Sequence, residues 1–312
     1  MPEHRAGLVA AVSAYLLWGL IPLFWPLLEP AAPVEILAQR VVWSLVFLAG
    51  VLALTSGFRW VRTLGAGRAR LLALAAALIT INWGTFIYGV NHDHVVEVSL
   101  GYFINPLVTV ALAVVVLHER LRRRQLFALA IAAAGVAVLA VDHGRPPWIA
   151  LALAFSFGAY GLVKKRVGVD GTQSLTVETA FLLLPALAYI AWLERAGDGT
   201  LASEGAGHIA LLAAGGVVTA VPLMLFGAAA IRIPLATVGQ LQYIAPVMQF
   251  LIGVLLNGEA MPASRLAGFA LVWAALVVFV YDAVRASRAG ARARRDAAAS
   301  DAARARESAV AA

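Results

Sequence analysis

Ten long apolar runs divide this chain and constrain its fold more than any short motif. They lie near residues 7–27, 34–54, 71–90, 97–117, 125–141, 148–163, 175–193, 209–229, 236–256 and 266–284. A run of roughly 17 to 25 apolar residues crosses the hydrocarbon core of a bilayer. Because no water reaches that core, the backbone groups of each crossing segment must be paired inside it. Each run is therefore predicted to be a transmembrane helix.

The composition excludes an ordinary soluble domain. Of the 312 residues, 62% are hydrophobic and 13% are charged, whereas about a quarter of the residues in soluble domains are charged. The chain contains no cysteine, which excludes disulfides, thiolate metal sites and cysteine catalysis. We therefore expect an all-α membrane protein whose partner is the lipid bilayer.

The positions of the basic residues predict how the chain is threaded. With the N-terminus inside, 20 of the 24 Lys and Arg residues fall on the inner side, and only Arg145, Arg195 and Arg265 fall outside. The positive-inside rule then predicts that both termini are cytoplasmic, which agrees with an even number of helices. The basic residues are scattered between apolar runs and form no folded basic face, so we expect no nucleic-acid partner.

Two segments 140 residues apart carry the same pattern. Pro106 is followed thirteen positions later by Glu119, and Pro246 is followed at the same spacing by Glu259. If each unit holds five crossings, an odd number, the second copy enters the bilayer from the opposite side. We therefore predict ten transmembrane helices in two inverted five-helix repeats. The predicted units are residues 1–144, residues 145–284 and a cytoplasmic tail, rich in Ala and Arg, at residues 285–312.

These prolines and glutamates are candidate helix breaks and gates. Pro106 and Pro246 each free a backbone carbonyl one turn earlier, and broken helices at equivalent depth in two halves point to a central substrate site. A packing kink is the alternative for either proline alone. Glu119 and Glu259 each end a predicted helix, where a carboxylate opposes the helix dipole. We interpret them as gates or helix-end clamps, with ordinary interfacial solvation as the alternative. The candidates to hold Glu119 are its neighbours Arg120, Arg122, Arg123 and Arg124.

Polar and aromatic residues inside the runs are the candidate substrate contacts. Residues three, four and seven apart share a helix face, so Tyr102, Asn105 and Thr109 form one polar stripe, and Gln242 with Gln249 forms a second. Hydrogen bonding to a neighbouring helix is the alternative for any one of them. The residues predicted to line or order the cavity are Trp18, Arg40, Asn82, Trp83, Tyr102, Asn105, Gln242 and Tyr243.

Arg40 lies about six residues into the second run. A buried arginine costs several kcal/mol unless it pairs or snorkels. Glu35 is the nearest carboxylate in sequence, but a spacing of five is poor for a pair on one helix face. A partner on another helix and snorkelling outward are the alternatives.

Motifs for rival functions are missing from the sequence. The chain has no G-x-x-x-x-G-K-[ST] phosphate loop, no H-E-x-x-H and no G-x-S-x-G. His92 and His94 flank Asp93, but two ligands on a loop are weak support for a metal site. We therefore expect no enzyme activity, no metal and no cofactor.

The chain resembles one family of carriers over nearly its full length. The matching stretches are Ala14-Tyr15-Leu16-Leu17-Trp18-Gly19, Glu35-Ile36-Leu37 with Arg40, Asn82-Trp83, Ser99-Leu100-Gly101-Tyr102-Phe103-Ile104-Asn105-Pro106-Leu107 and Gln242-Tyr243-Ile244 with Pro246. On these residues it resembles the RarD group of EamA-type carriers in the drug/metabolite transporter superfamily. The resemblance implies ten helices in two inverted halves, a central cavity and an alternating-access permease of the cell membrane. Gln39, Gln240 and Gln249 depart from the family pattern.

The expected function is that of a secondary transporter. It would move a small organic metabolite, an amino-acid-like compound or a drug across the bacterial inner membrane by alternating access. The alternative is a membrane-embedded binding or lipid-handling protein without vectorial solute transport. The expected partner in either case is a small molecule, and the sequence is compatible with a monomer or a homodimer.

Overall fold

The described part of the chain is built from helices, and no strand occurs within it. The computed structural model describes residues 2–55, 57–92, 94–141, 147–255, 266–268, 270–271, 273–275, 277–278, 281–282 and 285. The first half contains α1 (Pro2–Leu20), α2 (Pro33–Leu54), α3 (Ala66–Asn91), α4 (Val95–Leu117) and α5 (Arg123–Val141). The second contains α6 (Trp148–Val167), α7 (Gly171–Ala196), α8 (Gly205–Arg232), α9 (Leu235–Leu241) and α10 (Ile244–Leu255). Short 3-10 turns are η1 (Ile21–Leu23), η2 (Trp25–Leu28) and η3 (Arg59–Thr63).

Six of the described helices are long and apolar enough to cross a membrane. They span Glu3–Leu23, Pro33–Leu54, Ala66–Gly89, Leu100–Leu117, Gly171–Ala196 and Gly205–Arg232. The other predicted runs correspond to α5, to α6, to the pair α9–α10 and to helical residues between 266 and 285. The six helices coincide with the first four predicted runs and with the seventh and eighth. The ninth run is interrupted just before Pro246, where the sequence predicted a helix break.

Local signals explain where several helices begin and end. Asp170 caps α7, since its Oδ1 accepts a hydrogen bond from the Thr172 backbone N–H at 2.9 Å. Gly168 and Gly197 follow the ends of α6 and α7 with φ of 61° and 83°, in the left-handed region that glycine tolerates. Consecutive helices can therefore reverse direction within a few residues.

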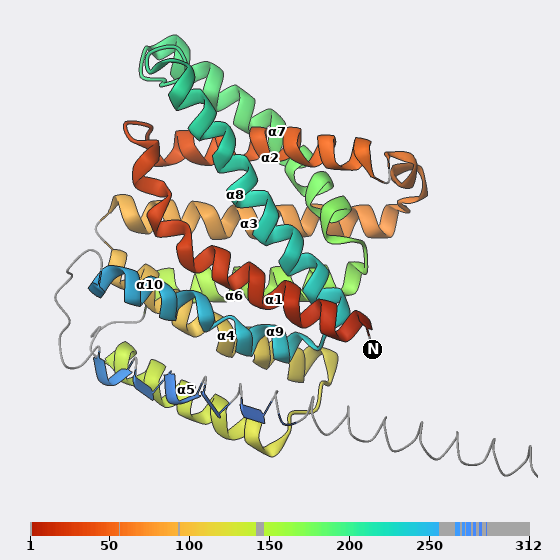
Figure 1. Cartoon of the computed structure of the whole chain (residues 1–312), viewed down its shortest axis with the longest axis vertical. Coiled ribbons are helices and arrows are strands. Elements are labelled where there is room, and N and C mark those ends of the chain that lie inside the picture. Colours follow the sequence, from red (N-terminus) through yellow and green to blue (C-terminus); the bar gives the residue numbers. More distant parts are fainter. Residues whose placement is uncertain are drawn as a thin grey trace, which may run out of the picture.

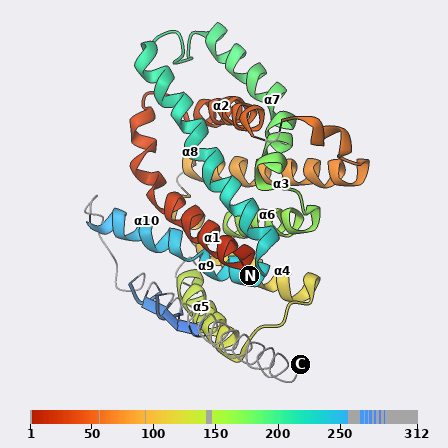
Figure 2. The same ribbon diagram turned by 45° about the vertical axis from the view of Figure 1, so that its right-hand side comes forward.

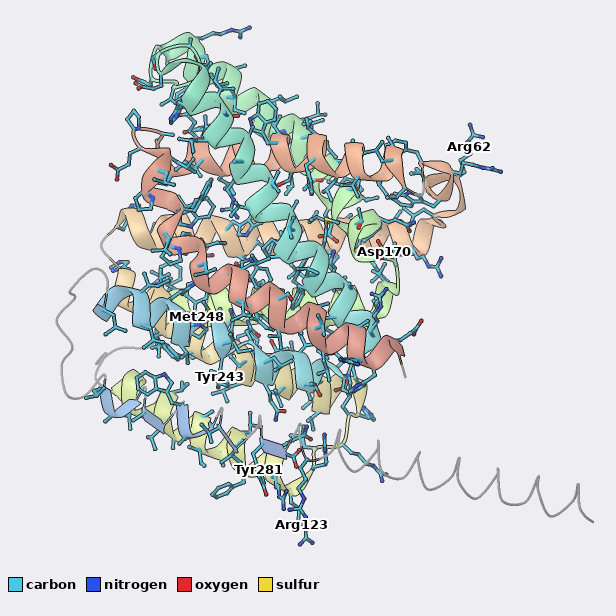
Figure 3. All side chains as sticks on the ribbon, viewed as in Figure 1. Arg62, Arg123, Asp170, Tyr243, Met248 and Tyr281 are labelled. Carbon is cyan, nitrogen blue, oxygen red and sulfur yellow. The ribbon has the colours of Figure 1, made fainter. Side chains whose placement is uncertain are left out.

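Successive connections lie at opposite ends of the helix bundle (Figure 1). The connections α2–α3, α4–α5, α6–α7 and α8–α9 lie at the end that also holds the N-terminus, on the right of the view. The connections α1–α2 and α7–α8 lie at the other end. Arg62 and Asp170 mark the first end in Figure 3. We call it the N-terminal end of the bundle.

Helices from the two halves of the chain interleave. α8 packs along α1 and α2, as Figure 2 also shows, while α6 packs along α3 and α4. α2 packs on α7, α4 packs on α9, and α1 packs on α10. The core therefore lies between the halves rather than within each of them.

Large apolar side chains also cover the outside of the bundle. Leu54, Val115 and Leu184 are 89%, 70% and 76% exposed, respectively. Such an apolar surface is unfavourable in water and suits contact with the hydrocarbon chains of lipid.

Glycines allow the closest helix contacts. A Cβ on Gly19 of α1 would lie 2.7 Å from the Met248 Cβ of α10. A Cβ on Gly158 of α6 would lie 3.0 Å from the Val108 Cγ1 of α4. A side chain at either glycine would press on the facing side chain, so glycine favours close packing of the helices at both points.

Candidate functional site

A cavity of about 140 Å³ lies in the middle of the bundle. Thr219 on its wall is near the midpoint of α8, and Phe157 is near the midpoint of α6. Both halves of the chain contribute to its wall. The lining residues are Tyr15, Trp18, Ile21, Trp25, Arg40, Ile79, Asn82, Trp83, Phe86, Tyr102, Asn105, Phe157, Thr219, Leu223, Gln242, Ala245, Pro246 and Gln249.

Aromatic rings form much of this wall. The rings of Trp18 and Phe157 lie edge to face with centroids 5.7 Å apart, and Phe226 packs behind both at 5.8 and 5.3 Å. On the α3–α4 side, the rings of Phe86 and Tyr102 lie 6.3 Å apart. A wall of this kind suits an organic molecule with apolar surface.

Arg40 is held in the cavity by contacts to three other elements. Its Nε donates to the Thr219 Oγ1 of α8 at 2.7 Å, and its guanidinium carbon lies 4.8 Å from the ring centroid of Trp25 and 5.0 Å from that of Trp83. Within the described residues no carboxylate forms an ion pair with it. Of the alternatives that the sequence leaves open, the structure therefore matches a partner on another helix.

Glu35 is engaged elsewhere. Its Oε1 accepts hydrogen bonds from the backbone N–H of Thr200, at 2.9 Å, and from the Thr200 Oγ1, at 2.8 Å. The hydroxyl of Thr200 also lies 2.9 Å from the Nε2 of His208. Glu35 therefore anchors the α7–α8 connection.

The two asparagines expected at the cavity donate hydrogen bonds to residues of α6. Asn82 donates from Nδ2 to the Leu153 carbonyl at 2.9 Å and to the Ser156 Oγ at 3.0 Å. With its amide nitrogen facing α6, Asn105 donates to the carbonyls of Leu153 and Ala154 at 3.2 and 3.0 Å. Both residues line the cavity, and both also fix α3 and α4 against α6.

The two polar stripes predicted on the fourth and ninth runs do meet. The Thr109 Oγ1 lies 3.4 Å from the Gln242 Oε1, and the Gln249 Nε2 donates to the Trp18 carbonyl at 3.1 Å. Gln242 and Gln249 line the cavity, whereas Thr109 does not.

The ninth run is broken beside the cavity. α9 ends at Leu241, and α10 begins at Ile244, so Gln242 and Tyr243 form a turn before Pro246. The Gln242 carbonyl, which the proline frees, accepts from the Ala245 N–H at 3.3 Å.

Two expected site residues lie away from the cavity wall. Tyr243 is buried on the face of α9–α10 that points toward α5, as its label in Figure 3 indicates, among Phe103, Ala132 and Val136. The reason is helical spacing: the lining residues of this segment, Gln242, Ala245, Pro246 and Gln249, are three, four and seven positions apart, so Tyr243, next to Gln242, faces another direction. Pro106 is also buried outside the wall, and α4 continues through it without a break. The expected helix break at Pro106 is therefore wrong, and close packing of α4 on α6 supports the helix across the lost hydrogen bond.

Comparison with known proteins identifies the family. The model of the EamA-like transporter family matches residues 5–141. Protein RarD of Streptomyces exfoliatus is 55% identical over 95% of each chain, and an uncharacterized transporter of Vibrio cholerae is 42% identical over 94% of this chain and 97% of that one. The chain belongs to the RarD group of EamA-type transporters. As a RarD-type protein it is a multi-pass membrane transporter.

A solved crystal structure shares the fold of this RarD-type transporter. The two structures align with a TM-score of 0.67 over 88% of this chain and 96% of the other, at 17% sequence identity. At that identity the likeness concerns the fold alone.

Glu119 of the RarD-type chain joins α4 to the start of α9. Its Oε1 and Oε2 accept hydrogen bonds from the backbone N–H groups of Leu235 and Ala236, each at 2.9 Å. The Lys165 Nζ lies 3.4 Å from the Oε1 and donates to the Ile233 carbonyl at 2.8 Å. The carboxylate therefore meets the positive end of a helix dipole, which offsets its unfavourable place at the end of α4.

Two of the four neighbouring arginines expected to hold Glu119 contact other groups. Arg122 pairs with Asp282 at 3.3 Å, and Arg124 lies over the ring of Tyr281 at 5.6 Å. They join the start of α5 to the last described residues. Glu259 lies outside the described residues.

A buried ion pair near the N-terminal end of the bundle was not predicted from the sequence. The Lys164 Nζ lies 2.7 Å from the Glu178 Oε1 and donates to the Ser174 Oγ at 2.7 Å, and the Tyr160 hydroxyl donates to the Glu178 Oε2 at 2.8 Å. Both charged side chains are 1% exposed. Lys164 and Glu178 lie 14 residues apart on different helices, and this spacing carries no pairing signal, so the network is seen only in the folded structure.

Sequence reasoning also missed two lining residues that bracket Arg40. Trp25 stands between Pro22 and Pro26, where the first run can no longer continue as a helix. Thr219 is a hydroxyl residue in an otherwise apolar run. An isolated polar residue of this kind is a detectable signal for a contact between membrane helices.

Proposed function

We propose that this RarD-type protein is an alternating-access secondary transporter of a small organic solute, such as a metabolite, an amino-acid-like compound or a drug. The proposal places it in the bacterial inner membrane with ten crossings in two inverted repeats. The observation that carries it is the central cavity, whose wall comes from both halves of the chain and borders the broken α9–α10 segment. Broken helices beside a midplane cavity are characteristic of secondary transporters.

Equivalent contacts in the two halves support the inverted repeat. Gly158 follows Gly19 by 139 residues, and Met248 follows Val108 by 140. The Gly19–Met248 contact of α1 with α10 is therefore the counterpart of the Gly158–Val108 contact of α6 with α4. In the same way, the packing of α1 on α8 corresponds to that of α6 on α3.

The charge distribution supports a cytoplasmic location for the N-terminal end of the bundle. Asp282, near the last described residue, pairs with Arg122 at the α4–α5 connection, which lies at the same end as the N-terminus. That end also carries most of the Lys and Arg residues. The positive-inside rule then orients this end toward the cytoplasm.

Close packing between the cavity and the N-terminal end of the bundle supports alternating access. The wall extends from mid-bundle residues such as Tyr15 to Trp25 in η2, at the end opposite the N-terminus. Toward the N-terminal end, Leu48, Leu72 and Val110 belong to a large apolar cluster, and Glu119 ties α4 to α9. We infer a conformation that is closed on the cytoplasmic side, from which transport requires that this packing open.

A ligand screen followed by a flux assay tests the proposal. A metabolite and drug library is first screened for compounds that raise the unfolding temperature of the purified protein, because a ligand that binds only the folded state stabilises it by mass action. A compound so found should then enter liposomes that contain the protein at a rate that saturates with its concentration. Lipid scrambling without solute flux would instead favour the lipid-handling alternative.

A further inference from the structure

We propose that the transported solute is a small organic anion whose carboxylate binds to Arg40. The inference rests on the proposed function and adds the substrate class. Arg40 is the only charged side chain among the residues that line the cavity. Because a charge inside the membrane is costly, an arginine kept there marks a substrate pathway when no protein group neutralises it.

The contacts of Arg40 leave part of its guanidinium for a ligand. The Nε is used by Thr219, and the rings of Trp25 and Trp83 lie against the group. No described residue accepts a hydrogen bond from the two terminal nitrogens, which therefore remain for a ligand in the cavity. A carboxylate fits a guanidinium through two parallel hydrogen bonds, so the geometry favours this group over a neutral acceptor.

The nearby charged groups also favour an anion. Glu35, the carboxylate closest to Arg40 along the chain, does not line the cavity, and its Oε1 accepts hydrogen bonds from Thr200. The buried Lys164 is by contrast neutralised by Glu178. With no carboxylate on the cavity wall, a cationic solute would meet the positive charge of Arg40 without compensation.

The rest of the wall fits the apolar body of such a solute. The cavity of about 140 Å³ is comparable to a dry cavity of roughly 150 Å³ that holds a benzene ring. Trp18, Phe86 and Phe157 supply aromatic surface, and the Gln242 amide lies beside them. The expected solute therefore has one carboxylate and a body about the size of one ring.

Matched pairs of probes test the charge preference. The full-length protein is titrated with benzoate, 3-phenylpropionate and 4-methylpentanoate, each beside its neutral amide, and with 3-phenylpropylammonium. Unfolding temperature and tryptophan fluorescence report binding. At least one carboxylate should bind about tenfold or more tightly than its amide, since a hydrogen bond to a charged group supplies about that discrimination. If no carboxylate binds in preference to its amide, or if the ammonium probe binds best, the proposal is overturned.

Variants of Arg40 test the residue. Arg40→Gln should weaken binding of the carboxylate about tenfold or more and leave that of the amide nearly unchanged, whereas Arg40→Lys should retain part of the preference. Arg62→Gln, in the exposed η3 turn, is the matched control and should bind as the parent does. Equal carboxylate preference in Arg40→Gln and the parent would overturn the assignment. If Arg40→Gln does not fold, the carboxylate preference of Arg40→Lys is compared with that of Arg62→Gln. A smaller preference in Arg40→Lys would support the assignment, and an equal one would overturn it.

Flux measurements separate failure of this inference from failure of the proposed function. Saturable flux of neutral or cationic solutes without carboxylate binding would overturn the anion assignment and leave the transporter proposal standing. Carboxylate binding that depends on Arg40 without flux into liposomes would support the site and contradict transport.

Discussion

The rings of Trp18 and Phe157 meet edge to face with their centroids 5.7 Å apart. Trp18 directly precedes Gly19, which contacts Met248 in α10, and Phe157 directly precedes Gly158, which contacts Val108 in α4. In the proposed inverted repeat, a pseudo-twofold axis in the membrane plane would pass between the two rings. Because both line the cavity, such an axis would also pass through the site.

The proposed orientation predicts which side of the membrane exposes single introduced cysteines. The chain has no native cysteine, so one introduced thiol is the only target for a maleimide. In intact cells a membrane-impermeant maleimide should label Ser203→Cys, in the α7–α8 connection, but not Arg62→Cys. After the membrane is permeabilised both should be labelled. Labelling of both positions in intact cells would contradict the proposed orientation.

Gly216 is predicted to be essential for the contact between α2 and α8. A Cβ there would lie 2.5 Å from the backbone carbonyl carbon of Trp43 and 2.6 Å from the backbone nitrogen of Ser44. Gly216→Ala should lower the free energy of unfolding by about 1–3 kcal/mol, because backbone atoms of α2 must shift. Thermal unfolding in detergent measures the effect.

Gly84→Ala is the matched control for this substitution. A Cβ at Gly84 meets nothing within 4 Å, so alanine should be neutral or stabilise α3 by about 0.5–1 kcal/mol. Equal unfolding temperatures for Gly216→Ala and Gly84→Ala would show that the close α2–α8 approach is wrong.

Replacing one partner of the Lys164–Glu178 pair should lower the free energy of unfolding strongly, and replacing both should lower it by less than the sum of the two single losses. Glu178→Gln keeps the shape of the side chain but leaves the buried ammonium without its counter-charge, so we expect a loss of about 3–5 kcal/mol. Lys164→Met should act similarly. The double variant should be more stable than the sum of the two losses predicts, which thermal unfolding of all four proteins measures.

Lys165→Met provides the control for that cycle. The Lys165 side chain is 25% exposed, and its ion pair with Glu119 is longer, at 3.4 Å. The expected loss is about 1 kcal/mol or less. Strict additivity of the two single losses at Lys164 and Glu178 would contradict a coupled pair.

The sequence predicted the helices well because lipid leaves the backbone few alternatives. The run predicted at 34–54 is α2, Pro33–Leu54, and the run predicted at 97–117 lies within α4. The ninth run is interrupted just before Pro246, as the sequence predicted, because the proline removes one backbone hydrogen bond of the helix. The chain orientation and the repeat stay predictions.

Individual site residues were harder to predict than the helices that carry them. Arg40 and Trp83 line the cavity as expected, and for Arg40 the reason is that a charge inside a membrane is costly unless it faces the protein interior. Tyr243 lies away from it because the lining positions 242, 245, 246 and 249 keep helical spacing, and a residue adjacent to Gln242 does not share that face. Trp25 was not predicted at the cavity because its position depends on how η2 packs over Arg40.

Gln242 and Asn105 should respond differently to an apolar substitution. Asn105→Leu removes two hydrogen bonds to the α6 backbone, so we expect a loss of stability of about 1–3 kcal/mol. Gln242 makes one long contact, to Thr109 at 3.4 Å, so Gln242→Leu should change stability little and ligand affinity more. Unfolding temperatures with and without ligand separate the two effects. A larger stability loss for Gln242→Leu would reverse the roles.

Glu119 should hold the cavity closed toward the N-terminal end of the bundle, which the proposed orientation assigns to the cytoplasm. Glu119→Ala removes both hydrogen bonds to the start of α9, and loss of a helix cap costs about 0.5–2 kcal/mol. If this loss falls on the closed conformation, the open population rises by roughly 2- to 30-fold. A cysteine at Ala236, which is 4% exposed, should then react faster with a maleimide applied from the cytoplasmic side. Glu194→Ala is the control, because Glu194 accepts a backbone hydrogen bond from Leu201 at the opposite end of the bundle. An unchanged rate at position 236 in Glu119→Ala, or an equal increase in Glu194→Ala, would show that Glu119 is not a clamp on this end.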